Sequence, residues 1–177
     1  MVIAALAVVT LVGAAAVSRS EQPEIQVFFS RVDQPRDAIS QALGGASATV
    51  HIAMYYFTDR GLADAIIRAR QRGVLVYVYL DRSQVQQQYS QARYLVAGGV
   101  PVRISSNRAI MHNKFAVVDG STVLTGSYNW TAAADQKNDE NLVVIHRADI
   151  AVRYKQRFAG FWTNEWDATA TGALRSN

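Results

Sequence analysis

The order of apolar and polar residues along the chain predicts alternating strands and helices. Runs rich in valine, isoleucine and aromatic residues favour strands, and two of these runs, 48–58 and 74–81, are apolar on both faces, as in strands buried inside a sheet. The expected strands are residues 24–30, 48–58, 74–81, 100–105, 114–119, 122–127 and 140–146. Asp119 and Gly120 separate two of them, which predicts a hairpin at that point.

Four other segments have patterns typical of helices. The expected helices are residues 35–45, 60–73, 89–99 and 148–166. The first opens on Pro35, and Asp59 can cap the second, whose apolar positions fall on one stripe. The whole pattern predicts an α/β fold: a single domain from 24 to 166, with a mixed central sheet flanked by helices on both faces.

The two ends of the chain differ from this domain. Residues 1–17 carry no charged side chain, and small residues cluster just before Ser18, as they do at signal-peptidase sites. Because a spanning helix needs about 20 apolar residues, the run is short for one. We therefore expect residues 1–18 to be a cleaved export signal, with a periplasmic or secreted protein as the product and a retained membrane anchor as the alternative. Residues 167–177 are expected to form a frayed polar tail.

Composition narrows the chemistry only in part. The chain has 18 Lys and Arg against 14 Asp and Glu, and just three of these 18 are lysine. The planar fork of an arginine fits phosphate oxygens, so the basic excess is compatible with a polyanionic partner as well as with an ordinary solvated surface. The chain has no cysteine, which excludes disulfides, thiolate nucleophiles and cysteine-based metal sites.

One stretch, residues 111–130, places one of the three histidines beside one of the three lysines. If the chain is extended from His112 onward, His112 and Lys114 point to the same face. The strand that follows is apolar on both faces and is expected to be buried. A histidine and a lysine side by side on such a strand need an anion beside them, and a phosphate would serve.

A second pair of polar residues follows the predicted turn. Ser127 and Asn129 are again two apart, and both offer neutral hydrogen-bond donors. Gly126 removes a side chain at a point where a ligand or another backbone comes close. Asp119, beside Gly120, occupies the position of an ordinary turn residue. The stretch therefore brings an imidazole, an ammonium, a hydroxyl and an amide into two adjacent segments.

These residues resemble the HKD motif of the phospholipase D superfamily. The family pattern is His-x-Lys, four residues, Asp, six residues and Gly-Ser-x-Asn. This chain keeps every spacing with His112, Lys114, Asp119, Gly126, Ser127 and Asn129. A chance match at six fixed positions is improbable. The resemblance covers roughly residues 24 to 166, and the chain is similar in particular to the small bacterial Nuc-type endonucleases, which are exported and carry one motif per chain.

The resemblance implies a phosphodiesterase that works through two histidines. In this superfamily one histidine attacks phosphorus and forms a phosphohistidine, while the other protonates the leaving oxygen and later activates water. This chain has one motif and no internal repeat, so the resemblance implies a homodimer in which each copy supplies one His112. The scheme needs no metal or other cofactor, and no cluster with metal-ligand spacing surrounds the motif.

The same resemblance assigns roles to the other motif residues. Lys114 and Asn129 would bind the non-bridging phosphate oxygens and stabilise charge in the transition state. Ser127 would lie near the phosphate or orient the site. Glu140 matches the family acid that hydrogen-bonds the far nitrogen of the histidine, whereas Asp119 is more structural than catalytic.

Residues outside the motif add less. Arg103 and Arg108 lie near it in sequence and are candidates for contacts to backbone phosphates. The tyrosines of the two buried strands are expected to pack in the core or on the sheet, although one near the site could stack on a base. No base-reading module is recognised.

Three functions follow from the residues and the resemblance. The leading hypothesis is a non-specific, metal-independent endonuclease that cuts DNA, with RNA as an open alternative. A phospholipase or lipid-phosphate transferase would use the same chemistry, with membrane contact expected if residues 1–18 are retained. A nucleic-acid-binding protein without turnover is the third reading. The intact His112 argues against it, because binding alone needs only the cations.

Overall fold

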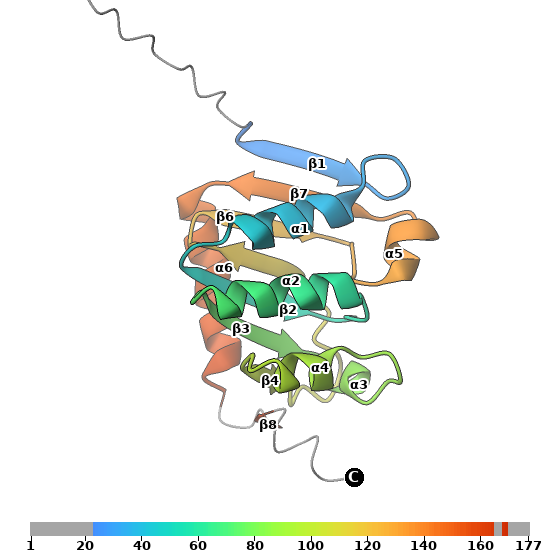
Figure 1. Ribbon diagram of the computed structural model, residues 1–177, viewed down its shortest axis with the longest axis vertical. Helices are drawn as coiled ribbons and strands as arrows, with labels where there is room; N and C mark the ends of the chain where they lie inside the picture. The colour runs from blue at the N-terminus through green and yellow to red at the C-terminus, as the bar shows by residue number, and fades with distance from the viewer. Residues whose placement is uncertain (1–22, 165–167, 170–177) are drawn as a thin grey trace, which may run out of the picture.

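In the part of the chain that the structure describes, eight strands form one mixed sheet, with α1, α2 and α4 on one face and α6 on the other (Figure 1). The computed structural model describes residues 23–164 and 168–169. The strand order is β1-β7-β6-β5-β2-β3-β4-β8, with β2, β3 and β4 parallel and the other neighbours antiparallel. The predicted fold class is confirmed.

The strands are β1 Ile25–Phe29, β2 Thr49–Met54, β3 Leu75–Leu80, β4 Val102–Ile104, β5 Lys114–Val118, β6 Thr122–Gly126, β7 Asn141–His146 and β8 Ala168–Thr169. The helices are α1 Pro35–Gly45, α2 Arg60–Gln71, α3 Arg82–Val85, α4 Ala92–Ala97, α5 Ala132–Gln136 and α6 Ala148–Trp162. The predicted export signal lies outside the described residues, as does most of the predicted tail.

The sequence pattern located seven strands and four helices, and it missed three short elements: α3, α5 and β8. The predicted strand 48–58 ends at Met54, where the chain leaves the sheet. The expectation of a frayed tail is wrong for Ala168 and Thr169, because they pair with Ile104 and Arg103 of β4.

Local chemistry explains where the first helices begin. Pro35 opens α1, where its missing N–H costs nothing because that group has no partner within a helix. The Asp59 carboxylate caps α2 by accepting the Leu62 N–H at 2.9 Å, as predicted. The same carboxylate accepts from the Arg36 guanidinium at 2.7 Å, which ties α1 to α2.

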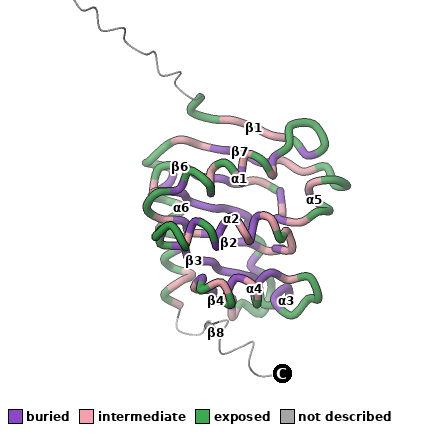
Figure 2. The backbone as a smooth tube through the Cα atoms, in the orientation of Figure 1, coloured by how far each residue is buried: buried purple, intermediate pink, exposed green. Residues whose placement is uncertain are grey.

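In the described part of the chain, the buried apolar side chains form two clusters, one on each face of the sheet. Figure 2 marks the buried positions along the backbone, many of them in the central strands. Ala116 and Val118 of β5 belong to the cluster under α1, α2 and α4, whereas Phe115 and Val117 belong to the cluster under α6. Every residue of β5 is buried, which confirms the prediction of a strand covered on both sides. Within the described part of the chain, no helix is both long and apolar enough to span a bilayer.

The register of β5 determines where the motif residues lie. Met54 at the end of β2 pairs with Lys114 at the start of β5, and Val50 near the start of β2 pairs with Val118. Gly126 at the end of β6 pairs with Leu142 of β7. The start of β5 and the end of β6 therefore lie at the same end of the strands, and the turn between them lies at the opposite end.

Candidate active site

His112 lies in the segment just before β5, next to the end of β2. Its side chain is exposed, and its ring meets the ring of Tyr55 edge to face, with 4.6 Å between the centroids. Tyr55 directly follows β2, so the pairing of β2 with β5 brings the two rings together. An exposed imidazole held against an aromatic ring is accessible to a substrate and restricted in its motion.

Lys114 is only 9% exposed, although it carries an ammonium group. The ammonium donates to the His112 carbonyl at 3.0 Å and lies 5.2 Å from the centre of the Tyr55 ring. Burial lowers the pKa of Lys114, and the nearby Glu140 carboxylate partly offsets this effect. No carboxylate of residues 23–164 forms an ion pair with it. A buried cation without a direct counter-ion is suited to binding an anion.

Asn129 follows β6, the second strand of the hairpin, and lies next to the end of β2, as His112 does. Its Oδ1 accepts the backbone N–H of Tyr56 at 3.2 Å, which leaves the Nδ2 hydrogens as donors. The backbone N–H groups of Thr58 and Asp59 donate to the Trp130 carbonyl at 2.9 and 3.0 Å, which secures this segment. His112, Lys114 and Asn129 therefore gather around the Tyr55–Tyr56 pair.

Gly126 and Ser127 join β6 to the start of β7. Gly126 has a φ of 144°, and a Cβ there would lie 2.2 Å from the Asn141 carbonyl oxygen. The close approach predicted at this glycine is thus confirmed, and the approaching group is backbone. The Ser127 hydroxyl accepts the Asn141 N–H at 3.0 Å, and the Ser127 N–H donates to the Asn141 carbonyl at 3.1 Å. These two hydrogen bonds hold Ser127 against the start of β7.

Glu140 lies directly before β7, beside this junction. Its carboxylate accepts from the Asn138 amide at 3.0 Å, and its backbone carbonyl accepts the Ser30 N–H at 3.0 Å. Among the described residues of this single chain, no hydrogen bond joins Glu140 to His112. The contact predicted between these two side chains stays a prediction.

Asp119 lies at the other end of β5. Its carboxylate accepts the backbone N–H groups of Ser47, Ala48 and Thr49 at 2.8–2.9 Å, together with the Ser47 hydroxyl at 2.9 Å. Burial alone would raise the pKa of Asp119, but these hydrogen bonds outweigh it and the pKa lies below its ordinary value. This motif residue connects the hairpin turn to the start of β2, in keeping with a structural role.

The two predicted phosphate-binding arginines have different surroundings. Arg108 is exposed in the segment that leads to His112. Arg103 in β4 donates to the backbone carbonyls of Trp162 and Asn164, the latter at 2.7 Å, and lies over the Trp162 ring. The guanidinium of Arg103 thus joins β4 to the end of α6, so the structure does not support it as a phosphate contact.

Asp81 fixes the segment just before His112, and the sequence analysis did not single it out. It is fully buried at the end of β3, and its Oδ2 accepts the backbone N–H of Met111 at 2.6 Å, one residue before His112. Its Oδ1 accepts the N–H and hydroxyl of Ser83. The sequence signal was an acid directly after an apolar strand. Tyr55 was expected to be a packing residue, and its contact with His112 depends on strand pairing.

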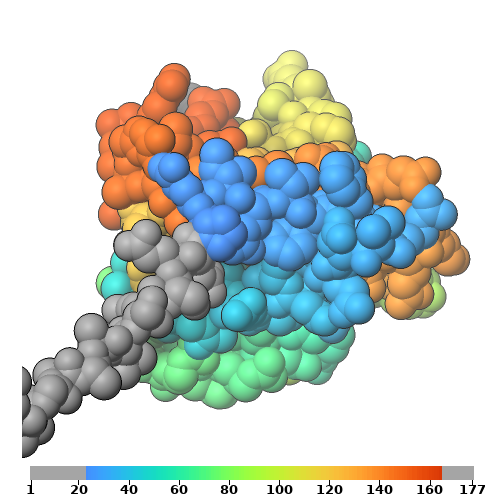
Figure 3. All heavy atoms as spheres, turned by 90° about the horizontal axis from the view of Figure 1, so that it is seen from above, coloured from blue at the N-terminus to red at the C-terminus, as the bar shows by residue number. Residues whose placement is uncertain are grey.

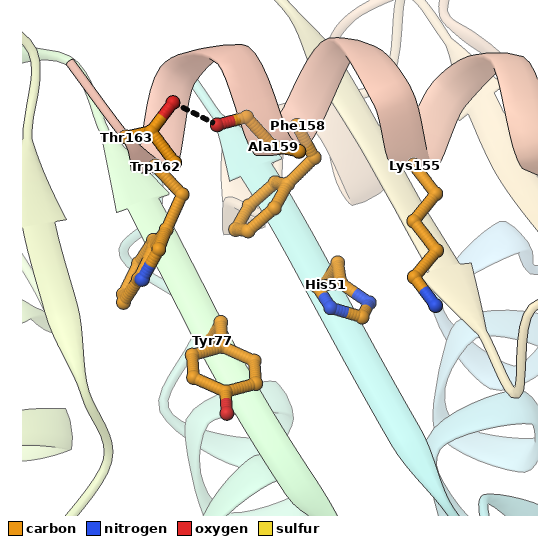
Figure 4. Close-up of a pocket in the computed structure, with 7 residues that line it drawn as sticks. All are labelled: His51, Tyr77, Lys155, Phe158, Ala159, Trp162 and Thr163. Carbon is orange, nitrogen blue, oxygen red and sulfur yellow. Dashed lines mark hydrogen bonds between the residues drawn. The ribbon is translucent and has the colours of Figure 1, made fainter.

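A cavity of about 280 Å³ lies away from this site, between α6 and the sheet (Figure 4). His51 lines it together with Tyr77, Lys155, Phe158, Ala159, Trp162 and Thr163. The His51 ring stacks on Tyr77 and meets Phe158 edge to face, and burial, with a smaller effect of Lys155, lowers its pKa. These contacts show that His51 is a packed histidine. The described residues contain no group of three or more potential metal ligands.

Comparison with known proteins identifies the family. A family model described as "Cardiolipin synthase, PLD-like domain" matches residues 39–162. The chain belongs to the phospholipase D superfamily. Over 142 residues it is 32% identical to a protein named Phospholipase D from Rickettsia bellii, covering 80% of this chain and 71% of that protein. Over 122 residues it is 38% identical to the mitochondrial cardiolipin hydrolase of Xenopus tropicalis, covering 69% of this chain but 58% of that protein.

Two solved structures of this superfamily's fold are similar over most of the chain. Nuc from Salmonella typhimurium, described as a phospholipase D family member, is 32% identical, with a TM-score of 0.78 over 84% of this chain and 98% of Nuc. NucT from Helicobacter pylori is 24% identical, with a TM-score of 0.72 over 78% of this chain and 94% of NucT. The second similarity supports the fold alone.

Proposed function

We propose that this phosphodiesterase-superfamily protein is a metal-independent endonuclease that cleaves DNA without sequence preference, with RNA as a second candidate substrate. It acts as a homodimer in which two His112 side chains share one site. The observation that carries the proposal is that the exposed His112 lies beside the buried Lys114, whose ammonium donates to the His112 carbonyl at 3.0 Å. Export across the inner membrane belongs to the same proposal and rests on the pattern of residues 1–18.

In the proposed reaction a nitrogen of one neutral His112 attacks the phosphorus of a phosphodiester. The N–P bond forms as the P–O bond to the leaving group breaks, and the second, protonated His112 gives its proton to the leaving oxygen. Water then attacks the phosphorus of the phosphohistidine, the N–P bond breaks to release the first His112, and the second histidine takes the proton from that water. Lys114 and Asn129 bind the non-bridging oxygens throughout.

Several features support nucleic acid as the substrate. The chain carries one motif and is 32% identical to Nuc over nearly the whole of that protein. The exposed Arg108 precedes His112 by four residues and can contact a neighbouring phosphate of a polynucleotide. The formal net charge of +4 also favours binding of a polyanion.

A lipid phosphodiester is the second candidate substrate. The relatives named phospholipase D and cardiolipin hydrolase favour it, because the chemistry at phosphorus is the same for both substrate classes. A nucleic-acid-binding protein without turnover is the weaker alternative, since it has no use for the imidazole.

The experiment is cleavage of plasmid DNA by the purified protein in excess EDTA, beside His112→Ala and the control His51→Ala. We expect nicking and linearisation by the parent and by His51→Ala, and loss of cleavage by about 1,000-fold or more in His112→Ala. Cardiolipin vesicles are tested in parallel. Hydrolysis of the lipid without cleavage of DNA would replace the nuclease proposal by the lipid one, and cleavage by His112→Ala would refute the mechanism.

A further inference from the structure

The cavity beside α6 is bounded by aromatic rings that contact one another in a closed circuit. Each of four rings meets two of the others, and the contacts alternate between stacked and edge-to-face, with centroids 5.1–5.6 Å apart: His51, Tyr77, Trp162 and Phe158. We call these four residues the aromatic circuit. Rings that support one another in this way are in position before a ligand arrives. The space of about 280 Å³ beside them is far larger than the voids of a close-packed interior.

The cavity and the candidate active site lie on different sides of α6. On one side, Tyr154 of α6 meets Phe115 edge to face, and Phe115 is the neighbour of Lys114 at the start of β5. Seen from above, a hollow lies between α6 and the yellow segment that leads into β5 (Figure 3). The cavity lies on the other side, against the first halves of β2 and β3. His51 precedes Tyr55 by four residues, which is about 13 Å along an extended chain.

Two polar groups of the lining have no partner in the described part of the chain. The Nδ1 atom of His51 is buried without a hydrogen bond, although buried polar atoms are normally paired. Lys155 is the charged residue among the described lining residues, and no carboxylate of residues 23–164 forms an ion pair with it. Figure 4 shows the Lys155 side chain beside the His51 ring. The cavity therefore combines apolar rings with an ammonium group that is available to a ligand.

The acids of the neighbouring elements are already engaged. Asp149 at the start of α6 pairs with Arg147 at 2.6 Å, and no acid follows it in residues 150–163. Asp119, beside the start of β2, accepts the backbone N–H groups of residues 47–49. The charges that remain next to the cavity are therefore positive.

This charge decides between two kinds of ligand for an aromatic site. Rings in such an arrangement can enclose a quaternary ammonium. Here the ammonium of Lys155 lines the cavity and the guanidinium of Arg103 lies 5.9 Å from the centre of the Trp162 ring, so a second cation is repelled. A carboxylate is attracted to the same groups. The volume lies at the lower limit of ligand pockets, about 300 Å³, which restricts the ligand to one or two rings.

We propose that this cavity is a binding site for a small planar aromatic carboxylate, separate from the site of His112. The ring of the ligand packs against the aromatic circuit, and its carboxylate accepts from the ammonium of Lys155. The proposal does not depend on the proposed endonuclease activity, because none of the motif residues lines the cavity.

The chemical class is tested by calorimetric titration of the purified protein with 2-naphthoate. We expect the parent to bind it about five-fold more tightly than neutral 2-naphthamide, since an ion pair at an exposed lysine contributes about that factor. Lys155→Met should remove this difference by weakening the binding of 2-naphthoate alone. Arg153→Met is the charge-matched control, because Arg153 is exposed on α6 outside the lining, and it should bind both probes as the parent does.

The place of binding is tested by filling the cavity. Ala159 lines it, so Ala159→Leu should weaken binding of 2-naphthoate by about 20-fold or more, because the new side chain occupies the space of the ligand. Gln156→Leu adds the same side chain at an exposed position of α6 outside the lining, and it should bind as the parent does. Leucine is a strong helix former, so both variants keep α6.

The other outcomes would overturn the proposal. A parent that gives no binding heat with 2-naphthoate would refute the site. Undiminished binding by Ala159→Leu would refute the cavity as its place, and loss of binding in Lys114→Met would then assign the carboxylate to the motif site. Tighter binding of 2-naphthyltrimethylammonium than of 2-naphthoate would assign the aromatic circuit to a cation instead.

Discussion

At the scale of one residue, Lys114 keeps a charged group at a buried position, where burial disfavours its charged form. The residue is 9% exposed, and its ammonium is accompanied by a backbone carbonyl and an aromatic ring, not by a paired carboxylate. The lowered pKa of Lys114 means that the folded protein disfavours the charged form relative to the unfolded chain. The charge is a cost to stability until an anion binds beside it.

Lys114→Met is therefore expected to separate stability from activity. Turnover should fall by about 100-fold or more, because the variant loses a charge that stabilises the transition state. At neutral pH its free energy of unfolding should equal or exceed that of the parent. Urea unfolding and initial rates of DNA cleavage measure the two quantities.

The pH dependence of this difference follows from the sign of the shift. The unfolded chain keeps its lysine proton to higher pH than the folded protein, so the parent gains stability as pH rises from the folded pKa to the ordinary value of 10.5. The advantage of Lys114→Met should shrink over that range. A matched Lys155→Met variant on exposed α6 should show neither effect, and a variant at position 114 that is much less stable than the parent at neutral pH would contradict the prediction.

At the scale of elements, the junction of β6 with β7 depends on one glycine. A methyl group on Gly126 would meet the Asn141 carbonyl, the same group that accepts the Ser127 N–H. Gly126→Ala should lower the free energy of unfolding by about 3 kcal/mol and also reduce turnover, because β7 must move away from the site. Thermal unfolding and cleavage rates provide the readouts.

Gly120→Ala is the control for backbone strain alone. Gly120 also has a positive φ, of 65°, but a Cβ there would have no heavy atom within 4 Å. Its cost should be about 1 kcal/mol, with turnover unchanged. Equal effects of the two substitutions would show that the contact with Asn141 does not matter.

The hairpin turn at the opposite end of β5 has a separate role. Asp119→Asn keeps the shape of the side chain but loses its charge and one acceptor oxygen, so stability at neutral pH should fall by about 1–2 kcal/mol. The lowered pKa of Asp119 means that the parent has this stabilisation above the ordinary value of 3.8 and loses it as pH falls through the folded pKa.

Urea unfolding between about pH 7 and pH 2 can follow this loss. The gap between the parent and Asp119→Asn should close on the acid side, and cleavage at neutral pH should be unaffected, since the motif histidine lies at the other end of β5. A variant that folds normally but has lost turnover would contradict the structural role of Asp119.

At the scale of the whole molecule, the proposed mechanism predicts how copies combine. Parent and His112→Ala subunits are mixed in equal amounts in denaturant and refolded together. If each site needs two His112 side chains, random pairing leaves about one quarter of the parent's activity at equal total protein, because only parent–parent dimers work. Sites that work independently would retain about one half, and that result would refute the shared site.

The local pattern was sufficient to predict most of the elements and the central motif. Apolar runs and turn residues located β1 to β7 and α1, α2, α4 and α6, since burial on one or two faces of an element leaves a periodic trace in the sequence. The fixed spacing of the motif indicated His112, Lys114 and Asn129, and the structure brings them together around Tyr55 and Tyr56.

Short elements left too little pattern to be found. α3 and α5 have four and five residues, fewer than two helical turns, and β8 has two residues. Arg103 looked like a phosphate contact because it lies nine residues before His112, but its strand places the guanidinium against the end of α6. Distance along the chain does not determine which side of a sheet a residue reaches.

The sequence by itself determined the alternation of strands and helices, the family and the residue types of the site, because these depend on local periodicity and on spacing within one hairpin. The tertiary structure alone decided that Tyr55 supports His112, that Asp81 holds the segment before it and that Asp119 connects the turn to β2. It also decided that His51 and Tyr77, which pair across β2 and β3, line a cavity under α6. Each of these depends on which strands pair, and strand pairing brings together residues that are far apart in the chain.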